Sequence, residues 1–148
     1  MPDIIKFDNP KMIERVAAYF SRAWGIPYLE YVKSLRAALS TEVGVPLWYL
    51  LLDGEEIVGG VGVIENDFHK RRDLTPNICA LIVNEEYRGR GLARGLIERV
   101  CEDLRVCNIS DVYLITTHTE LYERLGFEYY DDIEENDGGF VRCYHKRI

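Results

Sequence analysis

The sequence lacks any apolar run that approaches the ~20 residues needed to cross a bilayer. It also begins without the basic region, apolar stretch and cleavage site of a secretory signal. Positive charge is in deficit, because 18 Lys and Arg stand against 25 Asp and Glu, giving a formal charge of −7. Nucleic acids and anionic membranes bind basic surfaces. We therefore expect neither partner, and we expect a cytoplasmic protein.

Cysteine is also scarce, and its four positions follow no ligand pattern. No pair has C-x-x-C spacing, and no histidine lies at zinc-finger distance from any of them. We therefore predict no metal site and no disulfide framework. Free thiols buried in a reducing compartment are expected instead, at Cys79, Cys101, Cys107 and Cys143.

Internal repeats and Pro/Gly/Ser linkers are absent, and 148 residues suit one domain, so we predict a single domain over 1–148. The apolar periodicity predicts four helices and six strands. The segment 65–76 is polar and is predicted to be a loop, with a solvated Lys70-Arg71-Arg72 run. The order indicates an α/β (α+β) fold with a mixed sheet: helices 13–24 and 28–39, strands 47–52, 57–64 and 77–83, helix 91–106, strand 111–116, helix 119–125, strands 127–133 and 140–144.

A glycine-bearing loop, Arg88-Gly89-Arg90-Gly91-Leu92-Ala93, lies between a predicted strand and the longest helix. The first amides of a helix have no partner within it, and the helix dipole favours negative charge there. Glycine lets the backbone approach a phosphate closely, and arginine adds forked donors for phosphate oxygens. The loop therefore predicts an anion site.

Other nucleotide and hydrolase motifs are missing. The P-loop pattern G-x-x-x-x-G-K-[ST] is absent, and the dinucleotide pattern G-x-G-x-x-G fails because Arg94 occupies its third glycine position. No serine lies in G-x-S-x-G, which disfavours a serine hydrolase.

Two motifs in order carry a family resemblance. The loop fits [Q/R]-x-x-G-x-[G/A], and Leu121-Tyr122-Glu123-Arg124-Leu125-Gly126-Phe127 is similar to L-Y-E-[K/R]-L-G-F. Both resemble the GNAT superfamily of acetyl-CoA-dependent N-acetyltransferases. The resemblance implies a mixed, mostly antiparallel sheet that splays at the acetyl-CoA site and is flanked by about four helices.

The resemblance also implies how acetyl-CoA, the co-substrate, is held. Leu81, Ile82 and Val83 are implied to offer backbone groups to the pantetheine arm, and Arg88 to Ala93 to cradle the pyrophosphate, mainly through main-chain N–H groups. Thr117 and Tyr122 complete the implied cofactor contacts.

The catalytic roles come from the same resemblance. The Val83 N–H is the implied donor to the thioester oxygen, and Tyr122 is the implied general acid for the leaving thiolate. The general base stays open, because 75–80 contains no acid: His118 is a candidate after the next strand. Three carboxylates before the strand, and relay through water, are alternatives: Glu65, Asp67 and Asp73.

The expected activity is transfer of acetyl directly to a primary amine of a small molecule or peptide. The acceptor is expected to bind between the first two helices, their connecting loop and the last hairpin. A non-catalytic acyl-CoA-binding or regulatory module on the same fold is the alternative, and a longer acyl donor is compatible with the sequence. The resemblance favours a homodimer over a monomer.

Overall fold

The structure is a computed structural model that describes residues 1–148, and it has the predicted mixed α/β architecture. Two single-turn 3-10 helices, η1 (Pro10–Met12) and η2 (Glu85–Tyr87), accompany the main elements. None of its helices is long and apolar enough to cross a membrane. The helices are α1 (Ile13–Trp24), α2 (Tyr28–Leu39), α3 (Leu92–Val106) and α4 (Glu120–Arg124), and the strands are β1 (Asp3–Lys6), β2 (Leu47–Asp53), β3 (Glu56–Ile64), β4 (Asn77–Val83), β5 (Asp111–Thr116), β6 (Glu128–Glu134) and β7 (Phe140–Arg147).

All seven strands form one sheet in the order β1-β2-β3-β4-β5-β7-β6. Every neighbouring pair is antiparallel except β4 and β5, which are parallel. The mostly antiparallel sheet and the four helices confirm the predicted fold class. Strand β1 was not predicted, because it has only four residues, none of them fully buried, and so shows no alternating apolar pattern.

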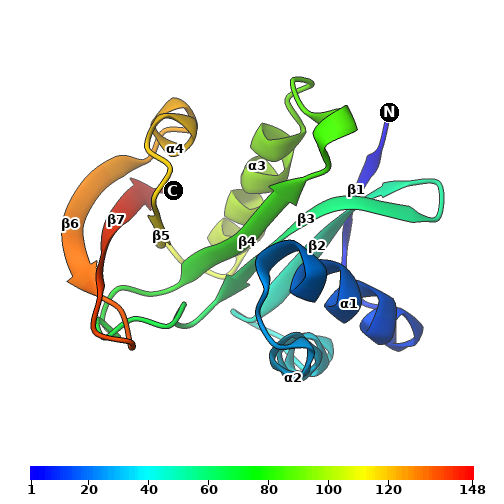
Figure 1. Cartoon of the computed structure of the whole chain (residues 1–148), viewed down its shortest axis with the longest axis horizontal. Helices are drawn as coiled ribbons and strands as arrows, with labels where there is room; N and C mark the ends of the chain where they lie inside the picture. The colour runs from blue at the N-terminus through cyan, green and yellow to red at the C-terminus, as the bar shows by residue number, and fades with distance from the viewer.

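Strands β4 and β5 meet at one end and separate toward the other, as Figure 1 shows. Their ladder has a single register pair, Asn77 with Tyr113, and the Tyr113 N–H donates to the Pro76 carbonyl at 3.0 Å. Beyond this point β4 carries a bulge: Ala80 has φ +57°, and the register with β3 shifts between Gly60 and Gly62. A bulge increases strand twist. The sheet is therefore open on the β5 side of β4.

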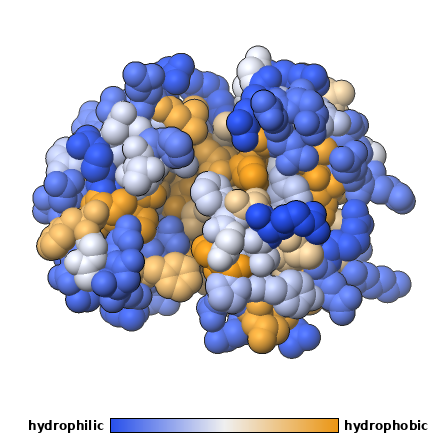
Figure 2. All heavy atoms as spheres, in the orientation of Figure 1, coloured by the Kyte–Doolittle hydropathy of each residue, from blue (hydrophilic) through white to orange (hydrophobic).

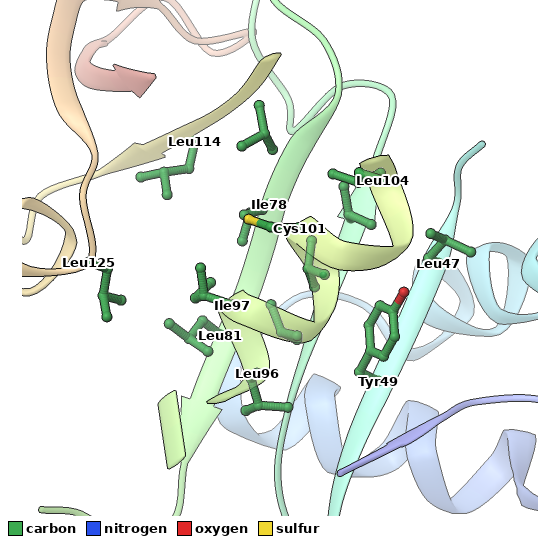
Figure 3. Close-up of a cluster of buried hydrophobic side chains, with 14 of the residues drawn as sticks. Leu47, Tyr49, Ile78, Leu81, Leu96, Ile97, Cys101, Leu104, Leu114 and Leu125 are labelled. Atoms are coloured by element: carbon green, nitrogen blue, oxygen red, sulfur yellow. The ribbon is translucent and has the colours of Figure 1, made fainter. Parts of the chain in front are cut away.

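Helix α3 covers one face of the sheet, and α1 and α2 cover the other (Figure 1). In α3, apolar residues at steps of four form a buried stripe. They pack against β2 to β5, as seen around Leu96 and Leu104 in Figure 3. Fully burying each such leucine contributes about 1.5–3 kcal/mol. The opposite core joins α1, α2 and the other face of β2.

Glycines in β3 let large side chains lie flat on the α1–α2 face. A Cβ on Gly62 would lie 2.5 Å from the Trp48 ring, and one on Gly60 would lie 2.7 Å from Phe20. The Phe20, Tyr31 and Trp48 rings pack together with centroids 5.0–5.7 Å apart. This cluster fixes where α2 presents its side chains toward the opening between β4 and β5.

Candidate functional site

A cleft of about 650 Å³ opens where β4 and β5 separate. Its walls come from α1, α2, the β3–β4 loop, β4, β5 and α4, and apolar residues outnumber polar ones among them. In Figure 2 a hollow with apolar side chains runs between the two halves of the molecule. An apolar cleft with a few convergent polar groups is typical of a small-molecule site.

Four ionisable groups from different elements converge in this cleft: Tyr31 from α2, Asp67 from the β3–β4 loop, Cys79 from β4 and Tyr122 from α4. The Tyr31 side chain is only 5% exposed, yet its hydroxyl has no hydrogen-bond partner. Leaving a buried hydroxyl unpaired costs about 1–3 kcal/mol. An unpaired group of this kind in a cleft indicates a place where a polar ligand atom binds.

Burial dominates the electrostatics of these groups. Desolvation, followed by the nearby charge of Glu135, raises the pKa of Asp67 to about 6. Desolvation and then the charge of Asp67 raise the pKa of Tyr122 to about 12. Burial raises the pKa of the Cys79 thiol well above its usual range. At neutral pH the Asp67 carboxylate therefore lies in the same cleft as protonated hydroxyl and thiol groups.

The loop that carries Asp67 is fixed by a buried polar network. His69 and Asn77 are both 0% exposed, and the His69 Nε2–H donates to Asn77 Oδ1 at 2.8 Å. The Arg71 N–H donates to His69 Nδ1 at 3.2 Å, which assigns this tautomer. Asn77 Nδ2 donates to the carbonyls of Glu65 and Leu74, at 3.0 and 2.9 Å. The network ties both ends of the loop to β4.

Two residues at the cleft have a left-handed backbone that is unusual for side chains larger than glycine. Phe68 has φ +61° and Ala80 has φ +57°, and both line the cleft. Such conformations cost on the order of 1–3 kcal/mol and gather at functional sites. Hydrogen bonds hold both: the Asn136 N–H donates to the Phe68 carbonyl at 2.9 Å, and Trp24 Nε1 donates to the Ala80 carbonyl at 3.1 Å.

The glycine loop follows the open end of β4. Gly89 and Gly91 both have φ +77°, and no atom lies within 4 Å of where a Cβ would stand on either. Gly91 caps α3 without any side-chain hydrogen bond, and the first turn of α3 contains no acidic residue. The Arg88 N–H already donates to the Glu85 carbonyl, at 3.2 Å. The remaining amides from Gly89 onward form an open, positive cradle suited to an anion.

The backbone of Val83 faces the opening. The Asn84 N–H donates to the Val58 carbonyl at 2.8 Å, so Val83 and Gly59 form a non-hydrogen-bonded pair of the β3–β4 ladder. The polar groups of Val83 therefore point away from β3. Its carbonyl accepts from Arg88 Nε at 2.9 Å, which leaves the N–H directed toward the gap.

The predicted site residues fall into two groups. Leu81, Thr117, His118 and Tyr122 line the cleft, whereas Val83 and the loop from Arg88 to Ala93 continue along the open end of β4. Ile82 differs, because it pairs with Gly60 next to the non-hydrogen-bonded Val83 pair, which turns its backbone groups toward β3. Its side chain packs on the α1–α2 face. The prediction that Ile82 offers backbone groups to a ligand is therefore not supported by this pairing.

The base candidates also separate. Glu65, Asp67 and His118 line the cleft. Asp73 does not, because its exposed carboxylate pairs with Arg71 at 2.9 Å. The last hairpin, β6–β7, contributes no lining residue, contrary to expectation; instead it supports the β3–β4 loop, with the Lys70 N–H donating to the Glu134 carbonyl at 2.9 Å.

Several residues that line the cleft were not predicted as site residues. Arg72 lies at the cleft, although it was assigned to a solvated run, and so does Lys33; both are exposed and neither has a salt-bridge partner. Cys79 was expected in the core but lines the cleft and is only partly buried. Tyr31 lies in the predicted helix 28–39, and no sequence signal marks its hydroxyl as unpaired.

Comparison with known proteins gives a family for this site. A sequence model described as "Acetyltransferase (GNAT) family" matches residues 10–127. The chain is 32% identical to N-acetylaspartate synthetase of Rattus norvegicus, over 75% of this chain and 39% of the relative. It is 30% identical to N-acetyltransferase 8B of Homo sapiens, over 69% of this chain and 50% of the relative. The chain thus spans half or less of the length of these two curated relatives.

Solved structures share the fold. An acetyltransferase from Salmonella typhimurium, solved with acetyl-CoA, superposes with a TM-score of 0.73 at 12% identity, covering 99% of this chain and 94% of that one. The resemblance carried by the two motifs, and the fold that it implied, are confirmed.

Proposed function

This chain belongs to the acetyltransferase (GNAT) family, and on that premise we propose that it transfers an acetyl group from acetyl-CoA directly to a primary amine of a small molecule or peptide. One observation carries the proposal. The gap between β4 and β5 has an anion cradle at its open end, a free strand amide along its edge and a partly buried tyrosine, Tyr122, across from it. These are the three groups that acyl transfer from a phosphate-bearing thioester needs.

Two glycines lie at the end of the site where the pyrophosphate would bind. Side chains at Gly89 and Gly91 would stand in open space beside the free amides of the α3 start, where the pyrophosphate would approach. Arg88 and Arg90 supply positive charge from the rim, because Arg88 is anchored on the Val83 carbonyl and Arg90 lies over the Tyr87 ring at 5.2 Å. Main-chain amides from Gly89 to Ala93 would provide most of the contacts.

The backbone N–H of Val83 lies where the thioester carbonyl would bind. Attack by an amine on a thioester places negative charge on the carbonyl oxygen. A preorganised N–H at that oxygen is worth about 3–4 kcal/mol of barrier. The Val83 N–H is directed into the gap and is held there by the ladder and by Arg88. Leu81 and Thr117 would border the acetyl group and the pantetheine arm from the two separated strands.

Tyr122 is proposed as the group that protonates the leaving sulfur. A pKa raised to about 12 keeps its hydroxyl protonated at neutral pH, and the Phe127 ring packs edge-on against it at 6.0 Å. Full transfer to a thiolate, whose conjugate acid has a pKa of ~8.5, is uphill by roughly 5 kcal/mol. Because the charge of Asp67 contributes to the raised pKa, neutralising Asp67 makes the Tyr122 proton easier to give. His118, exposed beside Thr117, is the neighbouring candidate for proton transfer to solvent.

The test compares Tyr122→Phe with Tyr130→Phe, a matched control whose ring lies outside the cleft. Thiol release from acetyl-CoA should fall about 10²- to 10⁴-fold in kcat for Tyr122→Phe, with unchanged acetyl-CoA affinity, and should stay unaltered in the control. An equal rate for both variants would remove Tyr122 from the mechanism.

The names of the relatives support an amine acceptor, since N-acetylaspartate synthetase and N-acetyltransferase 8B are both N-acetyltransferring proteins by name. A cytoplasmic location, one domain over 1–148 and assembly as a homodimer stay predictions. Light scattering of the purified chain tests the last of these.

A further inference from the structure

The floor of the cleft contains a carboxylate and a hydroxyl that the family motifs do not account for. Asp67 makes no hydrogen bond within the chain, so its environment offers it only burial and the charge of Glu135. The Tyr31 hydroxyl, in a side chain 5% exposed, is equally unpartnered. Both cost stability and neither is repaid by a contact inside the protein.

The two groups lie close enough to influence each other. Asp67, Tyr31, Cys79 and Tyr122 line the same cleft, and the charge of Asp67 contributes to the raised pKa values of the other three groups. The buried His69–Asn77 network fixes the loop on which Asp67 stands. This network therefore holds Asp67 in place, and packing against the Phe20 and Trp48 rings holds Tyr31.

We propose that Asp67 and Tyr31 form the amine-binding end of the acceptor site, where the Asp67 carboxylate receives a proton from the substrate ammonium and the Tyr31 hydroxyl accepts a hydrogen bond from the same nitrogen. This inference rests on the proposed acetyl transfer and assigns the base that the sequence left open. It specifies an acceptor that enters as a primary alkylammonium cation, because a partly buried carboxylate beside an unpaired hydroxyl matches a cation with three N–H donors.

The substrate nitrogen loses two protons during the transfer, and both are accounted for. One proton moves from R–NH3⁺ to Asp67, which releases it to water only after the acetyl transfer, and the neutral amine forms the C–N bond at the thioester carbon. The C–S bond breaks as sulfur takes the Tyr122 proton. The second N–H proton, which the nitrogen loses as it becomes an amide, restores the Tyr122 hydroxyl. Neutral Asp67 no longer raises the Tyr122 pKa, so removal of the first proton prepares the donor for the second step.

Other charged groups face the site without replacing Asp67. The cleft also contains Glu65 from the same loop and His118 from the β5–α4 connection, and both are exposed. Glu30, Lys33 and Arg72 are exposed cleft residues as well. A carboxyl with a pKa of about 6 is a good match to a base working near neutral pH.

The experiment measures thiol release with acetyl-CoA against a panel of free L-amino acids, spermidine and an aminoglycoside. The variants are Asp67→Asn and Tyr31→Phe, which keep side-chain size. Asp73→Asn is the control, since Asp73 is on the same loop but lies outside the cleft in a pair with Arg71. For Asp67→Asn, kcat/KM at pH 7 should fall about 10²- to 10⁴-fold, with acetyl-CoA affinity within twofold of wild type. For Tyr31→Phe, KM for the amine should rise roughly 10- to 150-fold, the effect of losing one hydrogen bond from a charged nitrogen.

The pH profile separates a base from a merely structural residue. For wild type, kcat/KM should decrease as the pH falls below about 6, because Asp67 becomes protonated. Asp67→Asn should lack that limb and recover about tenfold per pH unit as the free amine deprotonates in solution. A wild-type profile in Asp67→Asn, with activity within threefold, overturns the inference while leaving acetyl transfer intact. If wild type binds acetyl-CoA but acetylates no amine in the panel, the proposed function fails, and the inference fails with it.

Discussion

A substitution at Gly91 should weaken cofactor binding while it leaves the chain folded. Gly91 caps α3 with φ +77° and ψ 14°, so alanine there must adopt the left-handed region, at a cost of about 1–2 kcal/mol. No packing cost adds to this, because no atom lies within 4 Å of the new methyl group. For a chain of this size we expect a Tm lower by roughly 2–8 °C. The fold should survive.

The effect on binding should be larger than this strain. The methyl group would stand between the α3 amides and a bound pyrophosphate, and each hydrogen bond to a charged oxygen is worth about 1.5–3 kcal/mol. Loss of one such bond weakens binding roughly 10- to 150-fold. The assay is calorimetric titration of CoA into wild type and Gly91→Ala.

Gly54→Ala supplies the matched control. Gly54 has φ +62°, also has no atom within 4 Å of a built Cβ, and lies in the β2–β3 turn outside the cleft. The Tm of Gly54→Ala should fall by a similar amount, and this variant should bind CoA as tightly as wild type does. If Gly91→Ala binds CoA as tightly as Gly54→Ala does, the pyrophosphate lies elsewhere and the cradle argument is refuted.

Three further predictions concern the core and the cleft. Gly62→Ala should overpack the Trp48 ring, 2.5 Å from the built Cβ, and lower the stability by about 1–3 kcal/mol in denaturant unfolding; unchanged stability would mean that the ring moves freely. Because folding raises the Asp67 pKa from 3.8 to about 6, wild-type stability should decline as pH rises from about 4 to 6 and stay level above. Asp67→Asn should remove this dependence and be up to about 3 kcal/mol more stable at pH 7.5; equal pH curves for the two proteins would contradict the buried charge. His69→Ala should leave the Asn77 Oδ1 unpaired in the core and cost about 2–4 kcal/mol by chemical denaturation, and a loss under 0.5 kcal/mol would show that water replaces the lost hydrogen bond.

The sequence predicted the elements that bury a periodic face. The predicted helix 91–106 corresponds to α3 with its buried stripe, and the predicted strands 47–52 and 57–64 correspond to β2 and β3. It missed β1, a short edge strand with mixed burial. It also ended the last strand at 144, whereas β7 continues to Arg147 along β5. Short or edge strands depend on pairing with a distant partner, and local periodicity does not encode that partner.

The site divides in the same way. The glycine loop and Tyr122 stand in contiguous motifs, so their residue types and spacing suffice to mark them. Asp67 and Tyr31 are far apart in the chain, and their significance comes from a buried hydroxyl without a hydrogen-bond partner in the same cleft as a partly buried carboxylate. That property arises only when α2, the β3–β4 loop and β4 are assembled. No pattern of residue types in one sequence reports it.

The central claim is that this chain moves acetyl from acetyl-CoA to an amine within the cleft between β4 and β5. The most direct test follows wild-type protein with acetyl-CoA and the amine panel, and counts released thiol against N-acetylated product by mass spectrometry. The account predicts amine-dependent release, with one thiol for each acetylated amine. Tight binding of acetyl-CoA with no acetylated product from any amine would contradict it and favour a non-catalytic acyl-CoA-binding module.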